Sequence, residues 1–211
     1  MIVASVLKTG GEYSPCHVYN LRDMCRDFLP SHMFFCLTDV HLKNCEYIPL
    51  IHDWKGWWSK LELFRIEGPC LYFDLDTIIV GDCTDIVRTA QTKDFVILRD
   101  FYRGYTLTPI NPHAMGSGMM YWSKSMQFIY DLYLNDAQEV AGDQDFIEYA
   151  LRDRLDTVSY WQDICTGIVS YKAHDRHNGL QPTDKVVCFH GQPRPWNQSV
   201  IPYPNKGVHN E

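Results

Sequence analysis

The stretch "PCLYFDLDTIIVGD", residues 69–82, constrains the fold most, because it combines a buried-strand pattern with two carboxylates. Aromatic and β-branched residues dominate it, and a proline and a glycine bound it, which predicts one buried strand. Residues two apart in a strand point to the same face, so Asp74 and Asp76 should converge while Leu75 points away. Burying two like charges is costly unless something positive compensates them. A divalent ion such as Mg²⁺ or Mn²⁺, which takes oxygen ligands and shares them with phosphates, is the simplest compensator.

Composition limits the other possibilities. The chain has 211 residues, of which 45% are hydrophobic and 14% aromatic, as expected for one domain with a sizeable core. No stretch is apolar enough for a membrane span, and the start "MIVASVLKTGG" has no basic region, so we expect a first strand and a cytoplasmic location. The net charge of −7 argues against a protein that wraps a nucleic-acid backbone, although it leaves a local basic cleft open.

The cysteines favour a reducing environment. There are 8 of them, without a C-x-x-C pair, and several lie inside apolar strand patterns. We therefore predict free, buried thiols rather than a zinc site or a disulfide framework.

Strand and helix patterns alternate along the first part of the chain, which predicts an α/β fold with a largely parallel sheet. Expected strands are 2–7, 33–39, 69–82, 94–100, 116–123, 156–162, 167–174 and 185–191, and expected helices are 14–30, 57–67, 124–135 and 143–155. Ligands of open α/β sheets bind beyond the carboxyl ends of the strands. Polar residues at or near such ends should therefore share one cleft: Lys8, Thr9, Thr38, Asp39, Asp74, Asp76 and Asp100.

Five segments of the sequence resemble motifs of a known family. "YFDLDTIIV" resembles the D-x-D signature of GT-A glycosyltransferases, in particular the retaining family-eight type that includes glycogenin and bacterial galactosyltransferases. "WSKLELF" is similar to the segment that carries the family's basic residue before that strand, here Lys60. "GSGMMYW" resembles the N-[AS]-G-[VM] segment, with Ser117 and Gly118 matching and Gly116 in place of Asn.

Two later segments agree in order and approximate spacing. "GDQDFI" resembles the G-D-Q-D segment at all four positions, Gly142, Asp143, Gln144 and Asp145. "FHGQPRPWN" resembles the C-terminal H-x-x-G-x-x-K-P-W segment, with Gly191, Pro195 and Trp196 matching and Arg194 at the Lys position. Five segments in the right order are more specific than D-x-D alone.

One departure concerns the metal-binding histidine of that last segment. Aligning on Gly191 places Cys188 at its position, and His190 follows two residues later. In a strand both would point to the same face. Imidazole suits Mn²⁺ better than a thiol does, so we assign the ligand role to His190.

The resemblance implies a single GT-A (Rossmann-like) domain over residues 1–197, with a mixed, mostly parallel sheet flanked by helices, and an irregular tail over 198–211. It implies a metal-dependent enzyme that transfers a sugar from a nucleotide sugar, UDP-sugar by resemblance only, with retention. The acceptor, whether a glycan, a protein or a small molecule, is not identified, and no catalytic base or nucleophile can be assigned.

The resemblance also implies roles for individual residues. Mn²⁺ or Mg²⁺ would be held by Asp74, Asp76 and His190, with Leu75 between the two carboxylates. The diphosphate would be neutralised by Lys60 and Arg194. The base and ribose would lie against Val6, Leu7, Lys8, Thr9 and Asp39, and the backbone would approach the donor at Ser117, Gly118 and Gly191. Sugar hydroxyls would be gripped by the catalytic candidates Asp143, Gln144 and Asp145.

Plainer interpretations stay open for several of these residues. Asp143 could be a helix N-cap, Lys60 a solvent-facing lysine and His190 a structural histidine. A cluster of tryptophans could form an acceptor-stacking surface or simply pack in the core: Trp54, Trp57 and Trp58.

Rival functions use the same aspartates. "DLDTI" nearly meets the D-x-D-x-[TV] signature of haloacid dehalogenase phosphatases, with Asp74 as nucleophile and Asp76 as general acid. That family also needs a G-D-x-x-x-D loop, and Ile147 stands at its last position here. "KTGGEY" is a faint version of a nucleotidyltransferase loop, and a non-catalytic sugar-nucleotide-binding module is a further alternative.

Overall fold

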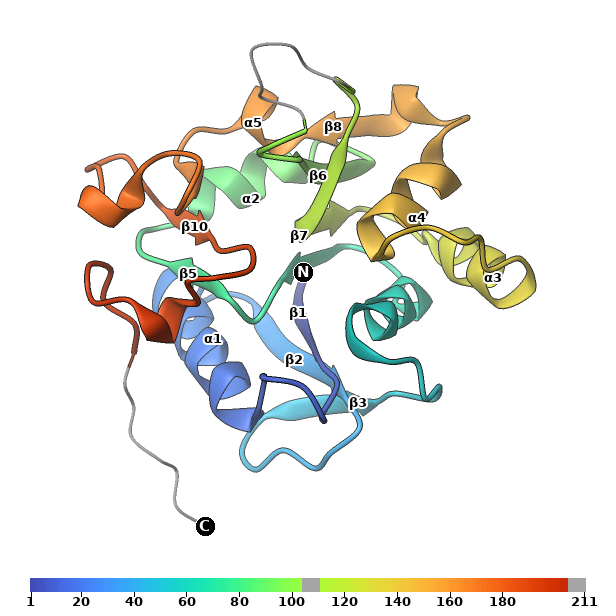
Figure 1. The fold of residues 1–211 in the computed structure, drawn as a ribbon, viewed down its shortest axis with the longest axis horizontal. Coiled ribbons are helices and arrows are strands. Elements are labelled where there is room, and N and C mark those ends of the chain that lie inside the picture. Colours follow the sequence, from blue (N-terminus) through green and yellow to red (C-terminus); the bar gives the residue numbers. More distant parts are fainter. Residues whose placement is uncertain (104–110, 205–211) are drawn as a thin grey trace.

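A seven-stranded sheet runs through the centre of the computed structural model, which describes residues 1–103 and 111–204 (Figure 1). Neighbouring strands are parallel except where β7 pairs with β4 and with β6, so the sheet is mixed and mostly parallel, as predicted. In spatial order the strands are β3 (Glu46–Pro49), β2 (Met33–Thr38), β1 (Ile2–Leu7), β4 (Cys70–Phe73), β7 (Met115–Trp122), β6 (Phe95–Arg99) and β8 (Val158–Tyr160).

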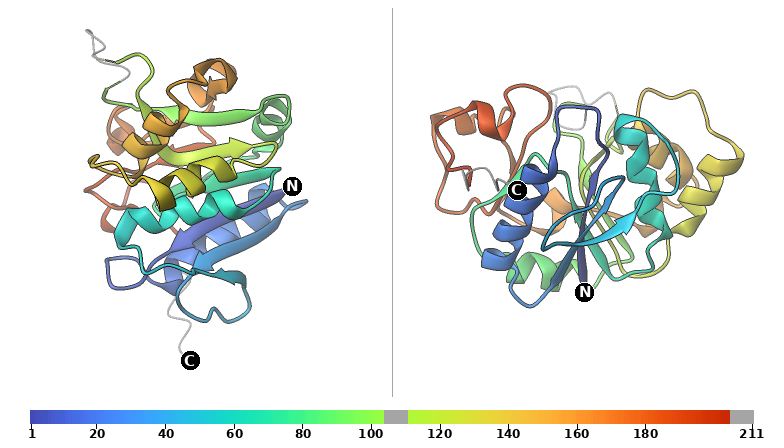
Figure 2. Two further views of the ribbon diagram at one scale, coloured as in Figure 1. Left: turned by 90° about the vertical axis from the view of Figure 1, so that its right-hand side faces the viewer. Right: turned by 90° about the horizontal axis from the view of Figure 1, so that it is seen from below.

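Helical segments cover both faces of this sheet (Figure 2). One hydrophobic core includes residues of α1 (Pro15–Phe28) and α2 (Thr84–Ala90), and the other includes residues of the 3₁₀ helix η1 (Gly56–Arg65), α3 (Gln127–Asn135) and α4 (Asp143–Leu151). The central strands contribute alternately to both: Leu71 and Phe73 to the first core, Cys70 and Tyr72 to the second. Burial on both faces explains why these strands are apolar throughout.

The first helix begins where the sequence signals it. Ser14 and His17 form a reciprocal capping box, with the Ser14 backbone N–H donating to His17 Nδ1 at 2.9 Å. Proline stands in the first turn, where no N–H is needed, and the helix ends after Phe28, two residues before Pro30.

The stretch 69–82 is not one strand, which corrects the sequence-based interpretation. β4 ends at Phe73, a turn closed by the Thr77 N–H and the Asp74 carbonyl (3.0 Å) follows, and β5 (Thr77–Ile79) joins a second sheet. That sheet has the order β5, β10 (Val186–Cys188) and β9 (Ile168–Ser170). The apolar run is continuous because β4 and β5 are both buried. Sequence periodicity alone does not show that the chain passes from one sheet to another between them.

Other differences are local. Strand β3 and helix α2 were not predicted, and Trp161 begins the short helix α5 (Trp161–Ile164) within the stretch expected to be a strand. β10 ends at Cys188, so His190 lies outside it and strand alternation does not decide its direction. Short 3₁₀ turns complete the structure: η2 (Leu155–Thr157), η3 (Arg176–Asn178) and η4 (Pro195–Asn197).

The C-terminal tail contains no helix or strand over residues 198–204, and the rest of it, 205–211, lies outside the described residues. Ile201 of the tail is nevertheless buried in the first core. All 8 cysteines lie in the described ranges and are free thiols, as expected, but Cys16 is exposed and Cys45 and Cys165 are only partly buried. No helix in residues 1–103 and 111–204 is long and apolar enough to cross a membrane.

Candidate active site

A cavity of about 1010 Å³ opens beyond the carboxyl ends of β1 and β4. Its walls come from the segment after β1, the start of η1, the β4–β5 turn, the end of β6, the start of β7, the start of α4 and the segment after β10. Most predicted site residues line it, namely Val6, Lys8, Thr9, Lys60, Asp74, Leu75, Asp76, Ser117, Gly118, Asp143, Gln144, His190, Gly191 and Arg194.

Asp74 is the first residue after β4, and buried groups hold its carboxylate. The Tyr72 hydroxyl donates to Oδ1, and Lys60 Nζ lies 2.9 Å from the same oxygen. The Asp74 backbone N–H donates to the Gly118 carbonyl of β7 at 2.9 Å. A Cβ on Gly118 would stand 3.4 Å from Asp74 Oδ2, so the glycine leaves this carboxylate its space.

Lys60 joins three elements in one buried network. Its ammonium is 2.9 Å from Ser117 Oγ and 3.0 Å from Asp143 Oδ2, and Ser117 Oγ donates to Asp143 at 2.5 Å. Burial lowers the pKa of Lys60, but the charges of Asp143 and Asp74 outweigh that effect and raise the pKa above its ordinary value. Lys60 is therefore a fixed, buried cation rather than a solvent-facing lysine.

Asp76 is held by a separate group of residues. Its Oδ2 accepts hydrogen bonds from the Tyr13 hydroxyl at 2.9 Å and from Arg194 Nη1. Arg194 Nε also donates to Glu12 at 2.8 Å. Burial first, and then the charge of Asp74, raise the pKa of Asp76 to about 7, despite the contact with Arg194. The aspartate pair is thus short of positive charge.

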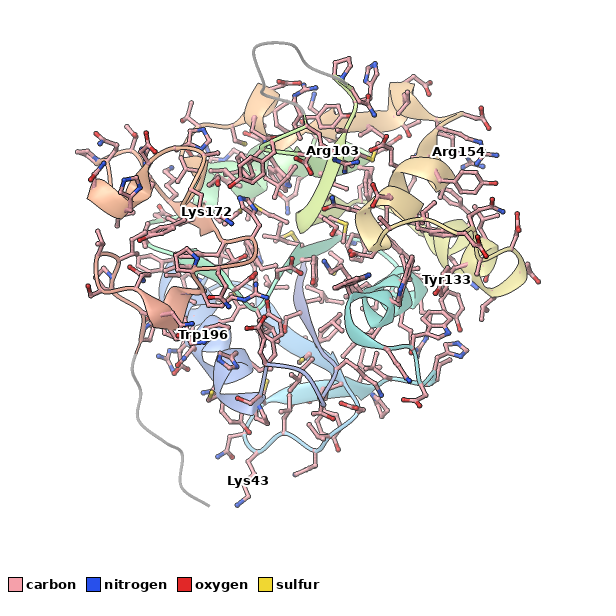
Figure 3. All side chains as sticks on the ribbon, in the orientation of Figure 1. Lys43, Arg103, Tyr133, Arg154, Lys172 and Trp196 are labelled. Carbon is pink, nitrogen blue, oxygen red and sulfur yellow. The ribbon has the colours of Figure 1, made fainter. Side chains whose placement is uncertain are left out.

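A third network surrounds the end of β6. Arg103, labelled in Figure 3, donates from Nη1 to Asp145 at 2.8 Å and from Nε to Asp100 at 3.2 Å. The Gln144 amide is 3.4 Å from Asp100, and both of these residues line the cavity. Asp145 is not among the lining residues, because it faces Arg103.

His190 and Cys188 both line the cavity but differ in environment. His190 Nε2 is hydrogen-bonded to Ser170 Oγ at 2.7 Å, and burial is the main reason that its pKa falls to about 4. Burial raises the pKa of the Cys188 thiol, and the charges of Asp76 and Asp74 add to that effect. His190 is therefore neutral at pH 7, and Cys188 is a protonated thiol.

The segment expected to bind the base is held by Asp39 from the adjacent strand end. Asp39 accepts from the Thr9 backbone N–H at 3.0 Å and from Thr9 Oγ1 at 2.9 Å, and Lys8 Nζ lies 3.0 Å away. Asp39 is not itself a lining residue, and Leu7 is fully buried in the core. Both residues support the cavity wall instead of facing the ligand space.

Sequence reasoning missed three residues of these networks. Tyr72 is two positions before Asp74, and that spacing was a usable signal because residues two apart in an extended chain point to the same side. Tyr13 and Arg103 carry no sequence signal, since only the tertiary structure brings them to Asp76 and to Asp145.

The donor groups of the cavity determine whether it suits a metal ion. In residues 1–103 and 111–204, no group of three His, Cys, Asp or Glu side chains could hold a metal. Two carboxylates that line one cavity and raise each other's cost of ionisation nevertheless fit Mg²⁺ or Mn²⁺, which commonly take one or two carboxylates and complete their shell with water and substrate phosphates.

No profile of a known protein family matches the chain, and no curated protein matches its sequence. Solved structures do match. The galactosyltransferase LgtC, crystallised with donor and acceptor sugar analogues, aligns with a TM-score of 0.63 at 11% identity over 95% of this chain and 91% of LgtC. The glycosyltransferase GlyE of Streptococcus pneumoniae TIGR4 aligns with a TM-score of 0.61 at 16% identity, over 95% of this chain and 57% of GlyE. Mouse xyloside xylosyltransferase 1 gives 0.52 at 13% identity, over 91% of this chain and 97% of that one. The chain has the fold of the GT-A glycosyltransferases, as the five segments predicted.

Proposed function

We propose that this protein is a metal-dependent glycosyltransferase that transfers a sugar from a nucleotide sugar, a UDP-sugar, to an acceptor with retention of configuration. The observation that carries the proposal is the turn between β4 and β5. It presents Asp74 and Asp76 to a large cavity at the carboxyl ends of the strands, with a cationic side chain beside each. The fold shared with LgtC, which was crystallised with donor and acceptor sugar analogues, supports the same conclusion.

The chemistry follows from the leaving group. When the bond between the anomeric carbon and the diphosphate breaks, negative charge grows on the phosphate oxygens and must be stabilised. Asp74 and Asp76 would hold a divalent ion, which when bound supplies Lewis acidity at that diphosphate. Lys60 adds a fixed positive charge whose position is set before the substrate arrives. Arg194 adds a planar guanidinium, which suits phosphate geometry.

The remaining residues would bind and orient the sugar. Asp143 and Gln144 line the cavity at the start of α4. The Asp143 carboxylate can accept hydrogen bonds from sugar hydroxyls, and the Gln144 amide can both accept and donate them. Asp145 acts through Arg103, which also holds Asp100. We propose His190 rather than Cys188 as a further ligand of the ion, because the imidazole is already neutral whereas the thiol would first have to lose its proton. His190 does not form a three-residue metal group with Asp74 and Asp76 in the structure, so it would have to leave Ser170 Oγ to reach the ion.

The test is release of UDP. The protein is incubated with a panel of UDP-sugars and Mn²⁺, and we expect UDP formation that EDTA abolishes. Asp76→Asn should remove that turnover while the protein stays folded, because it removes one charge from a like-charge pair. Asp85→Asn, at an exposed aspartate paired with Lys185, is the matched control and should keep full activity.

Four results would contradict the proposal. Turnover that is undiminished by EDTA would exclude the metal, and full activity of Asp76→Asn would exclude the aspartate pair. Hydrolysis of simple phosphate esters without UDP release would favour the phosphatase alternative, and pyrophosphate formed from a nucleoside triphosphate would favour a nucleotidyltransferase.

A further inference from the structure

The tryptophans between residues 54 and 58 have different environments in the structure. Trp54 stacks on His52 with ring centroids 4.3 Å apart, and Trp58 stacks on Tyr133 at 5.2 Å. These two rings are part of the packing around the second core. Trp57 is 58% exposed and lines the cavity, and it has no hydrogen bond, ring contact or cation partner among the described residues.

Trp57 lies against the start of α4. Its Nε1 is 3.4 Å from the point where a Cβ on Gly142 would stand, which places the indole beside this glycine. The next residue, Asp143, is hydrogen-bonded to Ser117 and paired with Lys60. The indole therefore lies beside Gly142, and the next residue in the chain, Asp143, belongs to the network proposed to bind the donor sugar.

A bare indole on a cavity wall selects a particular kind of ligand. It offers a flat apolar face and one N–H donor, so it suits a ring that has an apolar face and polar edges. A pyranose is such a ring, because its axial C–H groups form an apolar patch and its hydroxyls project from the rim. Polar side chains that can bind hydroxyls line the same cavity, among them Lys55 and Gln144.

The other half-exposed aromatic residue of the cavity is less suitable. Tyr102 is 48% exposed, but its ring already has an edge contact with His190 at 5.6 Å, and Lys172 Nζ lies 5.9 Å from its centroid. Trp57 is the aromatic side chain whose face is not yet used.

We propose that Trp57 is the stacking platform for a pyranose ring of the acceptor, so that the acceptor is a saccharide rather than a protein side chain or a small molecule without a sugar. This inference rests on the proposed function, since it takes the Lys60 and Asp143 side of the cavity as the place where the donor sugar is transferred. Trp57 is assigned to the acceptor and not to the nucleobase. The base is proposed to lie at the end of β1, whereas the indole lies beside the start of α4.

The test measures binding without turnover. Saturation-transfer NMR is recorded for methyl β-D-galactopyranoside, methyl β-D-glucopyranoside, methyl β-D-xylopyranoside and methyl β-lactoside, with UDP and Mn²⁺ present. We expect at least one of them to bind the wild type. Trp57→Ala should weaken that binding by about tenfold or more, the size of one lost aromatic contact, and Trp57→Phe should restore most of it.

Two controls separate the explanations. Tyr47→Ala removes an exposed aromatic residue outside the cavity and should change nothing. Calorimetry with UDP should give the same affinity for Trp57→Ala as for the wild type. If the UDP affinity falls tenfold instead, Trp57 stacks on the base and the inference is wrong. It is equally wrong if no glycoside binds, or if Trp57→Ala binds glycosides as the wild type does. Failure of the proposed function would appear differently, as absence of UDP binding and of UDP release in the wild type.

Discussion

Asp74 and Asp76 are two residues apart, yet they are stabilised by different kinds of structure. The partners of Asp74 stand on regular elements, with Tyr72 on β4 and Lys60 on η1. The partners of Asp76 stand on irregular segments from the two ends of the chain: Tyr13 precedes α1, and Arg194 precedes η4. The partners of Asp74 are thus fixed by regular secondary structure, whereas the partners of Asp76 depend on the packing of two irregular segments against each other.

The difference separates two tasks of one site. The Lys60 ammonium is buried and compensates two carboxylates, so its position is set by folding. Arg194 shares its guanidinium between buried Asp76 and Glu12, whose side chain is 43% exposed. An incoming diphosphate can compete for the guanidinium more readily than for the ammonium, because exposed ion pairs are weak. We therefore expect Lys60 to determine stability and Arg194 to respond to the donor.

The strongest test of this contrast is Lys60→Met. It leaves Asp74 and Asp143 without their common cation, and breaking a buried ion pair by removing one partner costs about 3–5 kcal/mol. We expect a loss of that size in the free energy of unfolding, measured by urea denaturation, together with loss of UDP release. Lys185→Met is the control, because its pair with exposed Asp85 should contribute no more than about 1 kcal/mol. Equal effects of both changes would contradict the assigned role of Lys60.

The second test is Arg194→Ala. Loss of one electrostatic donor to the transition state costs about 2.7–4 kcal/mol, so UDP release should slow by about 10²–10³-fold. The free energy of unfolding should fall by less than in Lys60→Met, because Glu12 can return to water, while Asp76 keeps its hydrogen bond from Tyr13 and can take up a proton. Steady-state kinetics and denaturation of the same samples check both points. If Arg194→Ala unfolds as easily as Lys60→Met, the two groups are not functionally distinct.

A third test concerns the other residues of the cavity that could reach the ion. His190→Ala should lower the affinity for Mn²⁺ by about tenfold or more, whereas Cys188→Ala should affect packing alone. Isothermal titration with Mn²⁺ in the presence of UDP measures the difference. A metal-bound structure in which Cys188 coordinates the ion, or in which His190 faces away from it, would overturn the assignment.

The last test concerns the pH dependence of stability without metal or nucleotide. The pKa of Asp76 is raised from 3.8 to about 7, so between these values the folded state holds a proton that the unfolded state releases. The contribution of Asp76 to stability is therefore present at low pH and is lost as pH rises through this range. Relative to Asp76→Asn, the wild type should become less stable over that interval, by thermal unfolding in a pH series.

Asp85 provides a control of opposite sign. Its hydrogen bond with Lys185 is the main reason that its pKa is lowered, so its contribution is present at neutral pH and is lost as pH falls through the acidic range. A wild type that gains stability relative to Asp76→Asn as pH rises would show that Arg194 and Tyr13 outweigh burial at Asp76.

The sequence by itself determined the class of fold and the centre of the site. Apolar strands with helical spacing between them predicted a mostly parallel α/β sheet, because periodicity and propensity are local properties. Asp74 and Asp76 were recognised because a carboxylate inside an apolar run is costly without compensation, and that cost is visible in the sequence. Both residues line the same cavity, but a turn between two sheets positions them, not the strand alternation that the sequence predicted.

The tertiary structure alone decided what compensates the two charges. Arg194 is 118 positions from Asp76, and Ser117 is 57 positions from Lys60. Tyr13 and Arg103 are likewise brought to the site by the tertiary structure. Trp57 differs from Trp54 and Trp58 because it lines the cavity and they do not. Compensation of a buried charge depends on which side chains the tertiary packing places within a few ångströms of it. Partners such as Arg194 are far away in the sequence, so a local sequence pattern does not identify them.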